Sequence, residues 1–108
     1  MAEKLTMEFA EKPEMNAVLA IPKGQVDVFS YKDFSQSLDT QTKDSSFINL
    51  IIDMGGVEYV GSSGWSVLFV QSDSMDKKGG SLVLCGLTDR VKRSLDLIMP
   101  KKRVLKIA

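Results

Sequence analysis

Residues 47–65 read FINLIIDMGGVEYVGSSGW, and this stretch decides the fold class. Its first seven residues are mostly apolar and β-branched, which is typical of a short central strand buried on both faces. The glycine pair at 55–56 ends that strand, and a loop is expected over 57–61. From Trp65 onward, apolar residues recur at helical spacing until the glycine pair at 79–80. The stretch therefore predicts a strand, a loop and a helix in succession.

The rest of the chain alternates between strand and helix periodicity. Strands are predicted at 5–9, 17–21, 47–53, 81–85 and 103–107, with a short extension at 26–28 after an interruption at 22–24, and helices at 31–38, 62–78 and 88–99. Ser30 and Asp33 predict an imperfect capping box at the start of the first helix. The order β-β-α-β-α-β-α-β predicts one α/β domain over residues 1–108, with a mixed sheet and three to four helices.

Composition excludes several classes of function. Lys and Arg number 14, Asp and Glu number 14, and the formal net charge is zero, which argues against nucleic-acid binding. The chain has no histidine, which excludes Ser-His-Asp and Cys-His catalysis and imidazole metal sites. A lone cysteine, Cys85, forms no internal disulfide and fits a reducing cytoplasm. Neither a signal peptide nor a membrane-spanning segment is expected.

Three enzyme motifs resemble parts of the sequence, and each lacks a chemical group. Residues 56–63 have the glycine spacing of a phosphate loop, but Ser62 replaces the lysine and Glu58 adds negative charge. Residues 61–64 place the second glycine one position early for a nucleophile elbow, and no histidine can act as base. Residues 74–77, SMDK, match a short S-x-x-K pattern without its partner motifs. The sequence therefore favours a binding protein, although an apolar ligand pocket would leave little trace.

Ser62 and Ser63 stand at the predicted start of a helix, which allows two interpretations. In the first, one serine caps the helix by accepting a hydrogen bond from an amide without a helical partner. In the second, a phosphate on Ser62 adds about 1.5 to 2 negative charges beside free N–H groups and the positive end of the helix dipole. The fold would tolerate that phosphate, whereas a partner without cations on the same surface would not. The second interpretation is a local binding switch.

The order of elements and several short motifs together resemble the STAS domain, the fold of the bacterial anti-sigma-factor antagonists. The resemblance covers nearly the whole chain. Its motifs are Gly24-Gln25-Val26-Asp27 at the end of an early strand, Ile51-Ile52-Asp53, Gly61-Ser62-Ser63-Gly64-Trp65, Gly79-Gly80 before a strand, and Val91-Lys92-Arg93 in the last helix. Two positions depart from the family pattern: Gly61 replaces an Asp, and Trp65 replaces a Leu or another aliphatic residue.

The resemblance implies a cytoplasmic regulator of bacterial transcription that is not itself an enzyme. An antagonist of this family binds an anti-sigma factor that is also a serine kinase of the GHKL ATPase type, and binding frees the sigma factor. The kinase then phosphorylates the serine after the motif's Asp, which corresponds to Ser62, with Ser63 as the alternative, and a PP2C-type phosphatase reverses the reaction. ATP belongs to the kinase, so no cofactor and no metal are expected in this chain.

Partner contact is expected to centre on two loops and the start of one helix. The candidate residues are Asp27, Gly61, Ser62, Ser63, Gly64 and Trp65. Some roles stay open: Asp27 is a site residue or a turn acid, and Trp65 is core packing or an exposed interface anchor. Because Gly61 replaces the family Asp, phosphorylation of Ser62 also stays open. The alternative function is a STAS subunit of a membrane lipid-transport complex of the ABC type, which docks on an ATP-binding subunit without phosphorylation.

Overall fold

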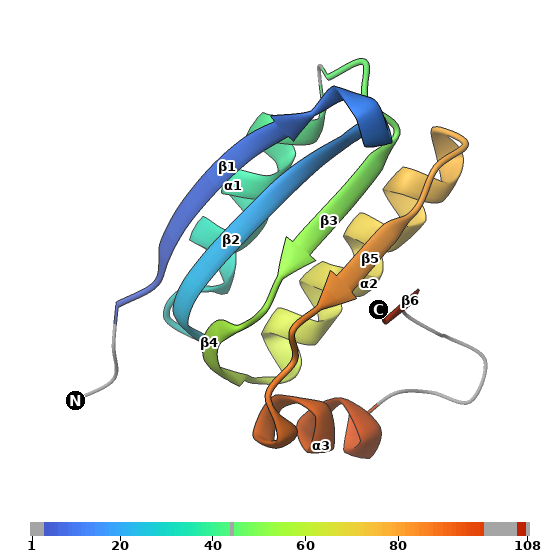
Figure 1. Ribbon diagram of the computed structural model, residues 1–108. Coiled ribbons are helices and arrows are strands. Elements are labelled where there is room, and N and C mark those ends of the chain that lie inside the picture. The colour runs from blue at the N-terminus through green and yellow to red at the C-terminus, as the bar shows by residue number, and fades with distance from the viewer. Residues whose placement is uncertain (1–3, 44, 99–105, 108) are drawn as a thin grey trace.

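The computed structural model of the chain describes residues 4–43, 45–98 and 106–107. Over these ranges the elements are β1 (Thr6–Lys12), a short 3-10 helix η1 (Pro13–Met15), β2 (Ala17–Val26), α1 (Tyr31–Thr42), β3 (Asn49–Asp53), β4 (Gly56–Val60), α2 (Ser62–Lys77), β5 (Leu82–Cys85), α3 (Asp89–Ile98) and β6 (Lys106–Ile107). Six strands form one mixed sheet, and α1 and α2 cover one of its faces (Figure 1). The predicted α/β fold class is confirmed.

The long strand β2 pairs with three other strands and organises the sheet. β1 pairs antiparallel with β2, and the sheet continues in the order β1-β2-β3-β5-β6. Along its other edge, β2 pairs in parallel first with β3, over Ala17–Ala20, and then with β4, over Lys23–Val26. β3 and β4 therefore follow one another beside the same strand.

Two sequence predictions fail at this point. The expected interruption at 22–24 lies inside β2, and the expected loop at 57–61 is largely the strand β4. Ile21 and Pro22 fall in the gap between the β3 ladder and the β4 ladder. On that side the missing N–H of Pro22 costs no ladder hydrogen bond, so proline is tolerated within the strand.

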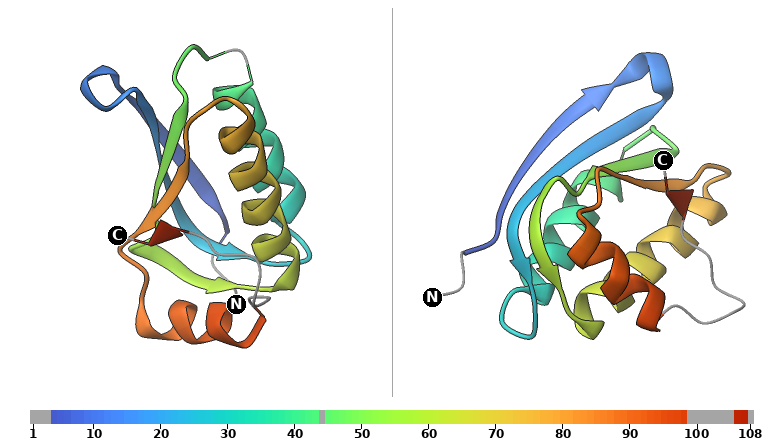
Figure 2. Two further views of the ribbon diagram at one scale, coloured as in Figure 1. Left: turned by 90° about the vertical axis from the view of Figure 1, so that its right-hand side faces the viewer. Right: turned by 60° about the horizontal axis from the view of Figure 1, so that its bottom comes forward.

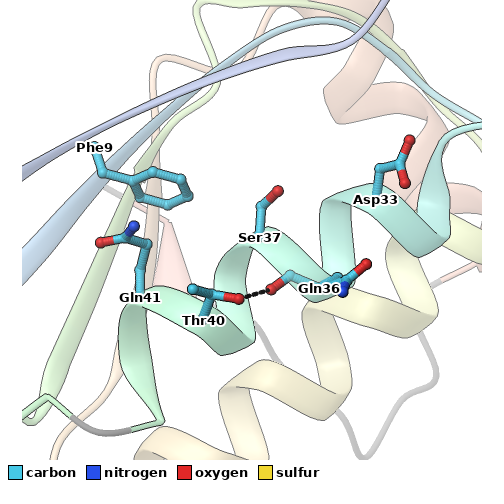
Figure 3. A pocket seen from close by; sticks show the side chains of 6 residues that line it. All are labelled: Phe9, Asp33, Gln36, Ser37, Thr40 and Gln41. Atoms are coloured by element: carbon cyan, nitrogen blue, oxygen red, sulfur yellow. Dashed lines mark hydrogen bonds between the residues drawn. The ribbon is translucent and has the colours of Figure 1, made fainter.

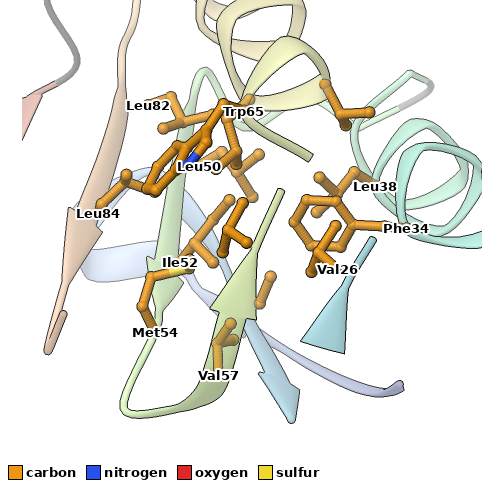
Figure 4. Close-up of a cluster of buried hydrophobic side chains, with 14 of the residues drawn as sticks. Val26, Phe34, Leu38, Leu50, Ile52, Met54, Val57, Trp65, Leu82 and Leu84 are labelled. Atoms are coloured by element: carbon orange, nitrogen blue, oxygen red, sulfur yellow. The ribbon is translucent and has the colours of Figure 1, made fainter. Parts of the chain in front are cut away.

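The core lies between the sheet and the two helices α1 and α2. Its largest members are at most 1% exposed and come from all layers: Phe34, Leu38, Leu50, Ile52, Met54, Trp65, Leu68, Met75, Leu82, Leu84 and Leu95 (Figure 4). Burial of each such side chain stabilises the fold by roughly 1.5–3 kcal/mol. Among the described residues no helix covers the opposite face of the sheet, where Leu19, Ile51 and Val83 are half-buried (Figure 2).

Trp65 belongs to this core. Its side chain is 0% exposed, and its Nε1 donates a hydrogen bond to Ser94 Oγ at 3.1 Å. Ser94 Oγ in turn donates to the Val60 carbonyl at 3.0 Å. One buried ring therefore joins α2, α3 and β4. Core packing of Trp65 is confirmed, and its expected role as an exposed partner contact is wrong.

Helix ends also differ from the sequence predictions. The capping box of α1 is absent: the Ser30 N–H donates to the Asp27 carbonyl at 3.2 Å instead of to Asp33. α1 continues past residue 38 to Thr42, where Lys78 Nζ donates to the Thr42 carbonyl at 2.9 Å. A cation 36 positions away in the chain thus satisfies the end of α1. The predicted terminal strand appears as β6, and residues 103–105 lie outside the described ranges.

The turn after α2 requires a glycine at position 80. A Cβ built on Gly80 would lie 1.8 Å from the Ile48 carbonyl oxygen, which is backbone and cannot rotate away. We expect Gly80→Ala to lower the free energy of unfolding by at least about 2 kcal/mol, because the β3 entry must shift to admit the methyl group. Urea denaturation followed by circular dichroism measures the change.

Gly79→Ala is the matched control for that substitution. Gly79 has φ +89°, but a Cβ there would meet no atom within 4 Å. Gly79→Ala is therefore expected to lower the free energy of unfolding only by the cost of holding alanine at a positive φ, about 1–2 kcal/mol. A cost for Gly80→Ala no greater than that for Gly79→Ala would contradict the steric account.

Candidate functional site

The ends of β2 and β4 bring together two segments that are far apart in the sequence. The strands are parallel, and their last residues, Val26 and Val60, are paired. The Gly61 N–H then donates to the Val26 carbonyl at 2.8 Å. Asp27 and Ser62 follow directly, so the structure places their segments side by side at one edge of the sheet, near the lower end of the molecule in Figure 1.

The segment after β2 is a turn held by its own side chains. Asp27 Oδ1 accepts a hydrogen bond from the Phe29 N–H at 2.9 Å. Ser30 Oγ accepts one from the Asp27 N–H at 3.0 Å and donates to the Gln25 carbonyl at 2.8 Å. Asp27 Oδ1 also lies 3.2 Å from the Ser30 hydroxyl, so the contacts of the Asp27 side chain fall within its own turn and the turn-acid interpretation accounts for its position. The turn directs the side chains of Val28 and Phe29 into solvent, where they are 67% and 90% exposed.

The segment after β4 is the first turn of α2. Gly61 is its N-cap residue, with φ −85° and ψ 178°, and it offers no side-chain hydrogen bond. Ser62 and Ser63 therefore occupy the first two helical positions, and the prediction that a serine caps this helix is wrong. The first amides of a helix have no helical partner, and here no cap side chain covers them. Ser62 is exposed and Ser63 half-buried.

Tyr59 occupies the space in which an acidic side chain at position 61 would begin. A Cβ built on Gly61 would lie 3.2 Å from Tyr59 Oη and 3.3 Å from its Cε2. The tyrosine is 39% exposed, so its ring can move outward by a few tenths of an ångström. The structure thus explains how glycine fits at the cap, and it also leaves room for an aspartate at modest cost.

Gly64 fixes the distance between α2 and the sheet. It is buried, and a Cβ there would lie 2.7 Å from Val26 Cγ1 and 2.8 Å from Val60 Cγ1. Any larger residue would push the first turn of α2 away from the strand ends. Of the six candidate contact residues, Gly64 and Trp65 are therefore buried and hold the first turn of α2 in place. Gly61, Ser62, Ser63 and Asp27 lie at or near the surface.

A groove of about 580 Å³ lies between the first halves of α1 and α2, next to these two segments. Its lining residues are uncharged and either apolar or hydroxyl-bearing: Val28, Tyr31, Ser35, Ser63, Ser66, Val67 and Val70. Val70 on the rim is 60% exposed. Among the described residues, this lining therefore has no charged group that could pair with a charged ligand.

Sequence periodicity did not single out Val28, Phe29 and Val70, whose apolar side chains are exposed in the structure. A signal for Val70 was present, because residues 67–70 are four consecutive apolar residues in a helix. Four such residues span most of the helix circumference, so one of them must face away from the core. Phe29 carried a weaker signal: it is an aromatic residue in a turn, outside the apolar stripe of α1.

Other features of the described residues offer little for catalysis. Burial raises the pKa of the Cys85 thiol above its ordinary value, and the Asp53 carboxylate raises it further, so the thiol is a poor nucleophile at neutral pH. Asp53 Oδ1 accepts a hydrogen bond from the Gly55 N–H at 3.0 Å, which is a turn role. No group of three or more potential metal ligands occurs in the described part of the chain. None of its described helices has the length and apolarity needed to cross a bilayer.

Solved structures with this fold include regulators and a transporter domain. An anti-sigma factor antagonist from Mycobacterium paratuberculosis is 20% identical, with a TM-score of 0.79 over 95% of this chain and 86% of that chain. The Bacillus cell fate determinant SpoIIAA in its phosphorylated form is 12% identical, with a TM-score of 0.67 over 95% of this chain and 91% of that one. The murine Solute Carrier 26 family member A9 anion transporter is 22% identical, with a TM-score of 0.69 over 77% of this chain but only 14% of the transporter.

Sequence comparison identifies the family. No curated protein matches the chain. The family model of the STAS domain matches residues 8–104, which is most of the sequence. The chain therefore belongs to the STAS domain family.

Proposed function

We propose that this protein is an anti-sigma-factor antagonist, and that phosphorylation of Ser62 controls its binding to an anti-sigma factor that is also a serine kinase. The observation that carries the proposal is the position of Ser62. It is an exposed hydroxyl beside a groove with no charged lining residue. The similarity of the fold to anti-sigma-factor antagonists supports the choice of partner.

The docking surface consists of the groove residues together with Phe29, Ser62 and the exposed part of Asp27. Phe29 and Val28 project from a turn that is held by internal hydrogen bonds, so little ordering is needed when a partner covers them. Exposed apolar side chains around a rigid groove are the kind of anchors that supply most of the binding energy in protein interfaces. We place the anti-sigma factor across α1, α2 and this turn.

Phosphorylation would oppose this contact by electrostatics and desolvation. A phosphate on Ser62 carries about two negative charges, and the partner must remove water from it in order to reach the groove. In the part of the chain that the structure describes, the groove lining has no lysine or arginine to pair with the phosphate. Desolvation of an unpaired charge costs several kcal/mol, which corresponds to a loss of about 100-fold or more in affinity.

The fold itself would accept the modification. Ser62 stands at the first position of α2, where amides without helical partners and the positive end of the helix dipole favour a negative group. The kinase, of the GHKL type, would bring its own ATP, and a PP2C-type phosphatase would restore the free hydroxyl. The structure of SpoIIAA in a phosphorylated form supports this kind of modification on the same fold.

The alternative is a STAS subunit of an ABC-type lipid-transport complex. Two observations favour it: Gly61 stands in place of the family Asp next to Ser62, and the fold also occurs within an anion transporter. In that role the same groove would dock on an ATP-binding transporter subunit, and Ser62 would carry no phosphate.

The Ser62 switch can be tested by affinity capture from lysate of the source cells, with partners identified by mass spectrometry. We expect wild type and Ser62→Ala to retain a GHKL-type kinase, and Ser62→Asp to lose it by about 100-fold, because the added charge is desolvated in the interface. Ser74→Asp is the matched control, since it adds the same charge to an exposed serine near the other end of α2. It should bind like wild type.

Two results would separate the alternatives. Equal capture of the kinase by Ser62→Ala and Ser62→Asp would refute the switch while leaving the partner intact. Equal capture of a transporter ATPase by all baits would instead replace the antagonist function with the transport function.

The docking surface predicts a loss of binding from changes that leave the fold intact. Phe29→Ser and Val70→Ser should each weaken capture of the partner by about tenfold or more, because each removes an exposed apolar anchor. Their free energies of unfolding should stay within about 0.5 kcal/mol of wild type. Leu97→Ser is the control, since Leu97 is 87% exposed on α3, outside the groove. A weaker capture by Leu97→Ser than by Phe29→Ser would place the interface elsewhere.

A further inference from the structure

β1 ends the sheet on one side, and its outer edge has no strand beside it in the described part of the chain. The strand is seven residues long, from Thr6 to Lys12, and it contains no proline. Such an edge presents a row of backbone N–H and C=O groups that a further strand can pair with. Edges of this length are usually covered, shortened or bent in monomeric proteins.

The space beneath this edge is open. A groove of about 360 Å³ runs between β1 and α1, and Figure 3 shows the Phe9 side chain pointing from the strand toward the helix. The other lining residues belong to α1 and are polar: Asp33, Gln36, Ser37, Thr40 and Gln41. A strand added to β1 would therefore find room for the side chains that point to the helix side.

The charged side chains of β1 that point away from the helices favour one partner strand, which is β1 of a second copy. Register with β2 places alternate residues of β1 on the sheet face without helices: Thr6, Glu8, Ala10 and Lys12. The β1 strand of a second copy can pair antiparallel with this β1 strand, related to it by a twofold axis perpendicular to the sheet. This symmetry keeps the four residues of both copies on the same face of the joined sheet. Centred on Glu8, this pairing opposes two glutamates. Centred on Phe9, it pairs neither Glu8 nor Lys12 with a charge.

Centred on Ala10, the same pairing sets Glu8 of each copy opposite Lys12 of the other. Opposite charges at directly facing positions stabilise a strand pair, whereas like charges destabilise it. Among these three registers this one alone forms two ion pairs, and the small Ala10 lies between them on the axis. The charge pattern of β1 therefore distinguishes one register from its neighbours.

We propose that two copies of this protein associate through their β1 edges, antiparallel about Ala10, with Glu8 of each copy paired to Lys12 of the other. The sheet then continues through both copies. A contact of one short strand on each side is small, so the dimer is a weak and reversible one. The pairing uses residues 8–12, next to the β1–β2 turn and at the far end of the molecule from the end of β4, which the start of α2 follows (Figure 1). The proposed docking surface beside Ser62 stays free in each copy, so the dimer can bind two partner molecules.

Sedimentation equilibrium from about 10 µM to about 1 mM, the range suited to a weak contact, tests the proposal. Wild type should show a monomer–dimer equilibrium. Glu8→Lys and Lys12→Glu should each raise the dimer Kd at least tenfold, because each sets like charges opposite one another. The double variant Glu8→Lys/Lys12→Glu should return the Kd to within about threefold of wild type, since the charges are exchanged but still paired.

Glu11→Lys is the matched control on the same strand. It makes the same charge change at an exposed position, but in this register Glu11 faces Phe9 rather than a charge. Its dimer Kd should stay within about threefold of wild type. A wild type that is monomeric throughout the range, or a double variant that fails to recover association, would overturn the proposal. Association that none of the variants changes would also overturn it, because the contact would then use another surface.

Discussion

Two features hold the first turn of α2 against the ends of β2 and β4. One is the parallel pairing of Val26 with Val60, which the bond from the Gly61 N–H to the Val26 carbonyl extends. The other is the absence of a side chain at Gly64, which lets the helix lie directly on these two valines. Ser62, Ser63 and the turn after β2 meet only because of this close approach.

In the first half of α2, the residues that pack in the core are different from those that are exposed beside the groove. Trp65 and Val67 follow the serines and lie in the core, so they fix the rotation of α2 about its axis. That rotation presents Ser62, Ser66 and Val70 outward. A change of charge at Ser62 would therefore act on a partner that covers the groove and would leave the core contacts as they are, which is the property that the proposed binding switch requires.

Much of this arrangement could be predicted from sequence periodicity. The apolar run at 47–53 predicted β3, which begins two residues later, and the helical spacing after Trp65 with the glycine pair at 79–80 predicted α2, because local hydrophobic pattern decides these elements. β4 was missed because its glycines indicate a loop and only pairing with the far end of β2 makes it a strand. The exposed side chain of Phe29 and the cap on α1 from Lys78 also depend on contacts that local pattern does not encode.

Hydrogen–deuterium exchange of the protein with and without the proposed kinase partner is the most direct test of the docking surface beside Ser62. We expect binding to slow amide exchange in residues 27–35 and 62–70, on the two sides of the groove, and to leave exchange in α3 unchanged. Protection confined to α3 or to the open face of the sheet would contradict it, because the partner would then dock away from Ser62.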